Sequence, residues 1–235
     1  YKREHLFALK QALELYDFYD LELHECDAEL EALYQQFDPP DDPGTPPPTP
    51  RRSKPRKNQA HFDLASALYR MSGVDLTQID GLDALTVQKV LSETGTDMSK
   101  WPTEKHFASW LRLCPNNQIT GGKVKQTGVQ PTTNRASTAL RLAASSLTHS
   151  DSALGAFYRR MRTRHGAPSA ITSTAHKLAR IIYFMLKENK PYHDIGADYY
   201  EQQYRTRVLR NLTRQASRFG FRLLPLDQLP VQEDS

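Results

Sequence analysis

The chain has 235 residues, a formal net charge of +4 and only two cysteines, Cys26 and Cys114. This length can bury a core in one large or two ordinary domains. Two cysteines without a CxxC spacing exclude a disulfide framework and a cysteine zinc site. There is no secretory signal, and the most apolar run, Leu178–Leu186, is too short to span a bilayer. We therefore expect a reduced, soluble, intracellular protein, and a fragment of a longer one, because Tyr1 opens inside a helical pattern.

The charge is distributed unevenly along the chain. Residues 1–100 carry 11 Lys/Arg against 18 Asp/Glu, whereas residues 101–226 carry 20 against 6, a balance of +14. A solvated charged face would normally mix the two signs. A segment this basic favours a polyanion as partner, because each phosphate that it neutralises releases counterions. The composition thus predicts binding to nucleic acid.

Residues 1–37 are predicted to form a coiled-coil-like arm, one long amphipathic helix from about Leu6 to Phe37. Apolar residues recur every seven positions, at Leu9, Tyr16, Leu23, Leu30 and Phe37, as d positions of a heptad. Leu6 and Leu13 fill the matching a positions, but Asp20 and Asp27 interrupt them further along. This partly interrupted heptad pattern fits either a helical hairpin within one chain or an arm that dimerises.

Residues 38–60 are predicted to be a proline-rich, extended and semi-rigid linker. Eight of the fifteen prolines of the chain lie between Pro39 and Pro55, and such sequences favour polyproline conformations over packed elements. The basic end, Arg51 to Lys57, could contact phosphate or simply keep the linker soluble.

Residues 61–226 are predicted to be a helical domain, followed by a tail at 227–235. Short helices are expected at residues 61–73 and 100–114, with Pro102 in the first turn of the second. Further helices are expected at residues 134–147, 150–166, 169–190 and 199–220. The third of these four should be the buried central helix, and the second should be capped by Ser150 or Asp151 and end at Gly166. The fold class is therefore all-α.

Residues 79–95 resemble a helix-hairpin-helix element, two helices joined by a tight glycine turn whose N–H groups can face a phosphate. The position of the usual second glycine is Asp83, and an acid there would repel phosphate. The element could therefore be structural.

The segment "CPNNQITGGKVKQTG", Cys114 to Gly128, has neither helical nor strand periodicity and is expected to be a loop. It places the hydroxyl of Thr120 next to Gly121-Gly122 and close in sequence to Lys123 and Lys125. Glycines allow close approach of the backbone, and lysines can stabilise charge that develops on a phosphate. A hydroxyl is a competent nucleophile once it is activated. An ordinary glycine turn with a capping threonine is the alternative.

Three blocks of the chain resemble the insertion-sequence 110 family of transposases, the bridge-RNA-guided DNA recombinases. They are "IDGLDALT" (79–86), "FASWLRLCPNNQITGGKVKQTGVQPTTNRASTALRLAA" (107–144) and "AHKLARIIYFMLK" (175–187). The resemblance covers nearly everything after the proline-rich linker, and the first helix fits the coiled coil of that family. It implies a transposase domain that follows a coiled coil and an N-terminal metal-binding domain.

The resemblance further implies that Thr120 takes the place of the family's nucleophilic serine. Ser137, Ser145 and Ser146 are the alternatives. Metal-binding acids are not recognisable in this chain, so Mg²⁺ is expected only in the full-length protein, bound by the missing N-terminal domain, and no metal ligand is assigned here. The fragment alone should be inactive. The implied partners are donor and target DNA, a guide RNA, and further copies in a dimer or tetramer formed through the arm, in a prokaryotic cytoplasm at the nucleoid.

Basic residues of the second half are the candidate nucleic-acid contacts. They are Lys123, Lys125, Arg135, Arg159, Arg160, Arg162, Arg164, Arg205, Arg207 and Arg210, with Arg214 as a further choice. His106 and His176 lie on helices without partners at ligand spacing and are assigned core or surface roles. The leading function is the C-terminal part of a DNA recombinase. The alternative is a non-catalytic helical module that binds nucleic acid and dimerises.

Overall fold

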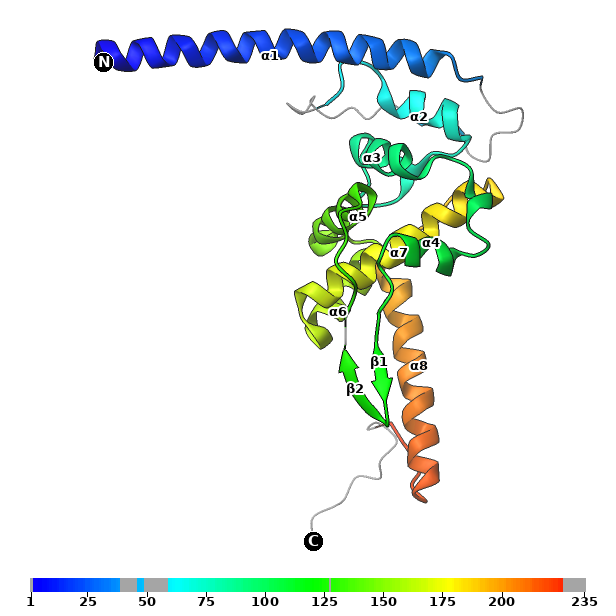
Figure 1. The fold of residues 1–235 in the computed structure, drawn as a ribbon. Coiled ribbons are helices and arrows are strands. Elements are labelled where there is room, and N and C mark those ends of the chain that lie inside the picture. The colour runs from blue at the N-terminus through cyan, green and yellow to red at the C-terminus, as the bar shows by residue number, and fades with distance from the viewer. Residues whose placement is uncertain (1, 39–45, 49–58, 127, 226–235) are drawn as a thin grey trace.

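The computed structural model describes residues 2–38, 46–48, 59–126 and 128–225. A long helix lies across one end of a helical body, and a hairpin and the last helix extend from the opposite end (Figure 1). The helices are α1 (Arg3–Gln35), α2 (Leu64–Ser72), α3 (Ala84–Thr94), α4 (Glu104–Trp110), α5 (Arg135–Ser146), α6 (Ala153–His165), α7 (Ala167–Glu188) and α8 (Ala197–Arg218). The strands are β1 (Gln118–Thr120) and β2 (Lys123–Gln126). The predicted all-α fold is confirmed, with this one hairpin added to it.

Helix α7 is the centre of the body, as its apolar sequence predicted. Helices α4, α5 and α6 all pack against it. Its buried positions include Leu178, Ile182 and Tyr183, which recur at helical spacing on one face. The hydroxyl of Tyr183 donates to the carbonyl oxygen of Trp101 at 2.9 Å, so the buried polar end of this side chain is satisfied. This contact fixes the segment before α4 on the central helix.

Helices α5 and α6 approach their neighbours closely because their buried faces carry small residues. On α5 these are Ala136, Ala139, Ala143 and Ala144. On α6, a Cβ added to Gly155 would lie 2.2 Å from the carbonyl oxygen of Ser150. Glycine is therefore required there by the backbone of the preceding turn, although it lies within a helix.

The helix starts follow side-chain capping, with two corrections to the sequence analysis. Asp63, Asp83 and Asn134 accept backbone N–H groups at the starts of α2, α3 and α5. The cap of α6 is Ser152, which accepts from the Gly155 N–H; the expected Ser150 or Asp151 was wrong. Ser150 instead bonds Asp80 and Ser152.

The start of α4 also differs from the prediction. Its N-cap is Thr103, so Pro102 precedes the helix and is not in its first turn. Trp110 is 42% exposed, although its ring lies 5.2 Å from that of Trp101. The neighbouring Phe107, Leu111 and Leu113 are buried.

The glycine turn before α3 is a packed structural turn. The residues ahead of it form only a 3-10 turn, Leu76–Gln78, so the first helix expected after Ile79 is not present. Gly81 has φ +87°, and a Cβ there would lie 2.9 Å from the carbonyl oxygen of Ala143. Asp83 accepts from the Thr86 N–H at 2.9 Å, which explains an acid at this position. The helix-hairpin-helix interpretation is not confirmed.

Helix α1 is the long helix expected at the start of the chain, and its described contacts with the rest of the chain lie in its C-terminal half. No residue of α1 is buried. The ring of Tyr34 lies 6.2 Å from that of Phe62, and the Tyr34 hydroxyl accepts from Gln88 of α3 at 3.3 Å. The basic end of the linker, Arg51 to Lys57, lies outside the described residues. None of the described helices combines the length and the apolar character needed to cross a bilayer.

Replacement of Gly155 by alanine tests the close packing of α6. A glycine-to-alanine change inside a helix normally stabilises by about 0.5–1 kcal/mol. Here the added methyl group meets a carbonyl oxygen, so we expect Gly155→Ala to lower the free energy of unfolding by about 1–3 kcal/mol in urea denaturation.

Thr163→Ala on the exposed side of the same helix is the matched control, because its hydroxyl contacts only the carbonyl of Arg159. This change should be neutral or slightly stabilising. A stabilising effect of Gly155→Ala would show that the turn before α6 yields, contrary to our interpretation.

Candidate nucleic-acid interface

The segment around Thr120 is a β-hairpin, which corrects the expected loop. Strands β1 and β2 pair antiparallel, with Thr120 opposite Lys123 and Ile119 opposite Val124. Gly121 and Gly122 form the two-residue connection with φ of +59° and +74°. Two positive φ values are the requirement of the turn whose twist matches paired strands, and only glycine meets it without strain. The strands are too short for their alternation to be recognised in the sequence.

Residues outside the strands hold the base of the hairpin. The Asn116 N–H donates to the carbonyl oxygen of Gly128 at 2.7 Å, and the guanidinium of Arg112 donates to the side-chain oxygen of Gln130. Arg141 of α5 donates to the carbonyl oxygen of Arg112 at 3.3 Å. Sequence analysis missed Arg112 and Gln130, because a pair 18 positions apart leaves no local pattern.

The hydroxyl of Thr120 is positioned beside cations at the exposed end of this hairpin. Thr120, Gly121, Gly122, Lys123 and Lys125 are all exposed. No described residue forms a hydrogen bond with the Thr120 side chain, and a Cβ added to either glycine would meet nothing within 4 Å. The tip of the hairpin is therefore accessible to a large substrate. A base or metal that activates the hydroxyl would have to come from outside the hairpin.

The alternative nucleophiles are either buried or hydrogen-bonded into their own helix. Ser137 is fully buried, and no described group bonds its hydroxyl. Ser145 and Ser146 donate to the carbonyl oxygens of Leu142 and Ala143, at 2.7 and 2.8 Å. A hydroxyl bonded into its own helix must break that bond to attack a substrate. Thr120 is thus the best placed of the four hydroxyls.

The four arginines of α6 divide into two structural and two exposed side chains. Arg159 donates to the carbonyl oxygens of Ser150 and Thr148, at 2.6 and 3.3 Å. Arg160 forms an ion pair with Glu201 of α8 at 2.7 Å, and its side chain is only 17% exposed. Arg162 and Arg164 are exposed. Of the four arginines, only Arg162 and Arg164 are free of these structural contacts and exposed to solvent.

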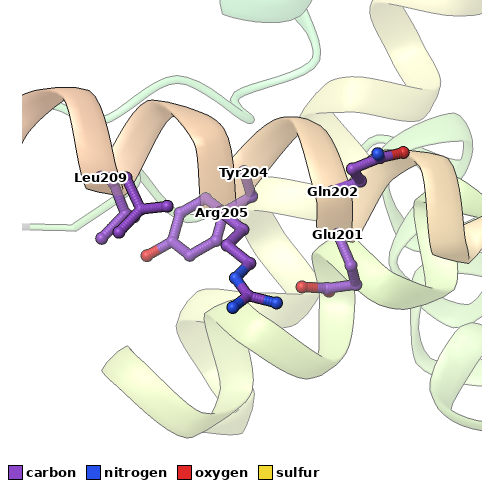
Figure 2. Close-up of a pocket in the computed structure, with 6 residues that line it drawn as sticks. Glu201, Gln202, Tyr204, Arg205 and Leu209 are labelled. Atoms are coloured by element: carbon purple, nitrogen blue, oxygen red, sulfur yellow. The ribbon is translucent and has the colours of Figure 1, made fainter. Parts of the chain in front are cut away.

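Aromatic rings of α8 hold the Arg160 guanidinium at the junction of α6 and α8. The guanidinium lies 3.5 Å from the ring centroid of Tyr204 and 4.6 Å from that of Tyr200. A shallow groove here is lined by residues of α8, among them Glu201, Tyr204 and Arg205 (Figure 2). Glu201 and Arg205 project to the same side of α8 in this view, and Gln202 projects to the other. The groove is therefore part of a helix junction and is not a cavity for a small substrate.

A lysine from α7 is held at the same junction. The Lys177 ammonium lies 4.2 Å from the ring centroid of Phe157. Burial lowers the pKa of Lys177 below its ordinary value, and the nearby Arg180, Arg160 and Arg207 lower it further. Partly buried cations thus hold the N-terminal part of α8 against α6 and α7. The C-terminal part of α8 projects beyond this contact.

The projecting part of α8 presents a row of exposed arginines. No residue of α8 is buried. Arg205, Arg207 and Arg210 are exposed, and Arg214 and Arg218 follow at helical spacing. The hairpin and α8 extend from the body toward the same end of the molecule (Figure 1). The hairpin that carries Lys123 and Lys125 and the arginine-bearing helix α8 therefore extend in one general direction.

The remaining predicted site residues have local partners. Arg135 pairs with Glu93 of α3 at 3.1 Å, although its side chain remains 86% exposed. His106 contacts the Thr103 hydroxyl at the start of α4. Burial lowers the pKa of His176, with a further contribution from Arg180. The core or surface roles expected for these two histidines agree with these positions.

Comparison with known families supports the resemblance noted from the sequence. Residues 75–159 match the family described as Transposase IS116/IS110/IS902 family. The match begins before α3, ends within α6 and includes the hairpin with Thr120. No match to a curated protein was found. Residues 75–159 are therefore similar to a portion of an IS110-family transposase, which supports a transposase of a mobile element and implies DNA as its partner.

Proposed function

We propose that this chain is the strand-exchange part of a DNA recombinase, with Thr120 as the attacking nucleophile. The observation that carries the proposal is the hairpin, which presents an exposed hydroxyl beside two lysines inside the family-matched segment. Phosphoryl transfer needs a nucleophile that can reach a backbone phosphorus, and positive groups that stabilise its developing charge. Thr120 provides the first, and Lys123 and Lys125 provide the second.

The proposed chemistry exchanges one phosphodiester for another. The Thr120 oxygen forms a bond to a DNA phosphorus, its proton passes to a base, and the sugar oxygen leaves with a proton. Reversal of this step with another DNA end rejoins the strand without an external energy source. No acid lies between residues 115 and 134, so the chain does not supply a carboxylate close in sequence to Thr120. Mg²⁺, held by an N-terminal domain as the family resemblance implies, would activate the hydroxyl, and a guide RNA would select the DNA.

The DNA would lie along the end of the molecule to which the hairpin and α8 extend. Arg205, Arg207 and Arg210 would neutralise its phosphates, with Arg162 and Arg164 as further contacts. Such contacts position a duplex without reading its sequence. This surface uses the exposed part of the positive charge in the second half of the chain, and it suits an enzyme of the prokaryotic nucleoid whose specificity comes from RNA.

The arm α1 would join copies of the protein into a dimer or tetramer. Large apolar side chains, among them Leu6, Phe7, Leu15 and Phe18, are more than half exposed. The exposed side chains include the apolar a and d positions of the heptad from Leu6 to Leu23, and such positions are normally buried against a partner helix. At least one partner helix is therefore needed to cover the arm.

Substitution of Thr120 tests the proposed nucleophile in a complete transposase with Mg²⁺ and guide RNA. Thr120→Ala should abolish strand cleavage and leave the affinity for DNA within a few fold, because the side chain supplies only the attacking oxygen. Thr120→Ser should keep or raise activity, since it removes the methyl group beside that oxygen. Covalent protein–DNA product on a denaturing gel is the measurement.

Ser145→Ala is the matched control for loss of a hydroxyl and should not affect cleavage. Cleavage by Thr120→Ala at the parental rate would reject the assignment. Loss of cleavage together with a large loss of DNA affinity would favour the non-catalytic module, with the hairpin as a binding element.

Replacement of the exposed arginines of α8 tests the DNA surface. The triple variant Arg205→Ala, Arg207→Ala and Arg210→Ala should flatten the slope of log affinity against log salt by about 2–3, because each lost phosphate contact removes about 0.9 from it. Fluorescence anisotropy with a duplex at several salt concentrations measures this slope.

A triple variant at the start of the chain, with Lys2, Arg3 and Lys10 changed to alanine, removes the same charge from a distant surface. It should leave the slope within about 0.5 of the parent, since no phosphate contact is lost. Equal flattening by both variants would show a net-charge effect, and an unchanged slope in the α8 variant would place the DNA elsewhere.

Charges on the apolar arm test self-association. The double variant Leu9→Glu and Leu13→Glu should sediment as a smaller species than the parent, because both side chains are more than half exposed and would lie in the helix contact. Sedimentation velocity distinguishes the two.

The control is the double variant Gln11→Glu and Gln35→Glu, which adds the same two charges without removing an apolar side chain. It should sediment like the parent. If the parent is itself a monomer at all concentrations, the arm does not join copies of this chain.

A further inference from the structure

Three side chains that can bind a metal ion meet where α1 crosses the segment before α2. Asp20 and His24 lie one helical turn apart on α1, and His61 comes from the segment that leads into α2. One potential ligand atom of each residue lies within 4.8 Å of the other two. The imidazole rings of His24 and His61 stack with centroids 3.4 Å apart. This cluster has no role in the function proposed above.

Hydrogen bonds to Nδ1 orient both imidazoles. Nδ1 of His24 lies 2.7 Å from the carbonyl oxygen of Asp20, which can only accept, so this nitrogen carries the proton. Nδ1 of His61 lies 2.8 Å from a carboxylate oxygen of Asp27, which also accepts the His61 backbone N–H at 2.9 Å. A neutral imidazole that donates from Nδ1 keeps its lone pair on Nε2. Metal-binding histidines are held in this way, by a carbonyl or carboxylate on the other nitrogen.

We propose that Asp20, His24 and His61 form a binding site for a divalent transition-metal ion, with Asp27 as the positioning residue of His61. Two imidazoles and one carboxylate suit Zn²⁺ and related ions, whereas Mg²⁺ prefers oxygen ligands alone. Ligands bound to tetrahedral zinc stand about 3.4 Å apart, given bond lengths of about 2.0–2.1 Å. The two stacked imidazoles would rotate out of their stack on binding, so that the ring planes meet at the ion and the ligand atoms reach that distance. The exposed side chains of Asp20 and His24 leave room for water at the fourth position.

The position of the site indicates its role, which is to fix the arm on the helical body. The described contacts between α1 and the rest of the chain lie in its C-terminal half, through His24, Asp27 and Tyr34. A metal ion shared by α1 and His61 would add Asp20 as an anchor, one turn closer to the open part of the arm. The ion would thereby set the direction in which the arm leaves the body. This proposal does not depend on the DNA chemistry or on Thr120.

Zinc binding to the chain tests the site directly. Isothermal titration of the metal-free chain with Zn²⁺ should give one equivalent of saturable binding. His24→Ala and His61→Ala should each weaken it at least 10-fold, because each removes a ligand. Asp27→Asn should weaken it by about 10- to 100-fold, as loss of an orienting carboxylate does at other metal sites. Zn²⁺ should also slow hydrogen exchange at the His61 amide, which donates to Asp27.

His5→Ala is the matched control, because His5 is an exposed histidine on the same helix. It should bind Zn²⁺ like the parent. These side chains are exposed or partly exposed, so circular dichroism should show unchanged helix content in every variant. Absence of saturable binding overturns the proposal. Binding that survives in His24→Ala and His61→Ala, or that falls equally in His5→Ala, overturns it as well.

Discussion

Burial of the apolar face of α7 is the constraint on which the arrangement of the other helices depends. Helices α4, α5 and α6 pack on this one helix, whereas α8 packs on α6 and meets α7 at Lys177. Fully buried residues such as Leu178 and Ile182 leave no room for displacement of the neighbouring helices. The hairpin leaves the body between α4 and α5, two of the helices that α7 positions. The location of Thr120 is therefore a consequence of this core.

The basic residues serve two different physical purposes in this domain. Arg159 and Arg160 satisfy backbone carbonyls, a carboxylate and aromatic faces, and thereby join helices. Arg205, Arg207 and Arg210 project into solvent and have no such task apart from the contact of Arg207 with Tyr204. Cations of the first kind are costly to remove for reasons of packing, and those of the second kind are available to a polyanion. Counting charges along the chain cannot separate the two kinds.

The arm shows how one helix face can serve two purposes. The apolar a and d positions from Leu6 to Leu23 remain exposed. The a positions that interrupt the heptad, Asp20 and Asp27, face the chain's own segment at His61. The next a position, Tyr34, packs on Phe62. The heptad therefore fails where the arm meets its own body, because that contact requires polar groups and an aromatic ring in place of leucine.

The sequence by itself determined the helical elements, the basic second half and the position of Thr120 beside two glycines. These features are local, since periodicity, capping and composition act within a few residues. Only the tertiary structure decided that the glycines close a β-hairpin, because its strands are too short to show alternation. Tertiary structure likewise decided that Arg160 joins α6 to α8 and that His61 meets Asp20 and His24. The contacts of Arg160 and His61 join residues about 40 positions apart. The free energy that offsets the entropy cost of closing such long loops comes from the packing of the whole body, which no local pattern encodes.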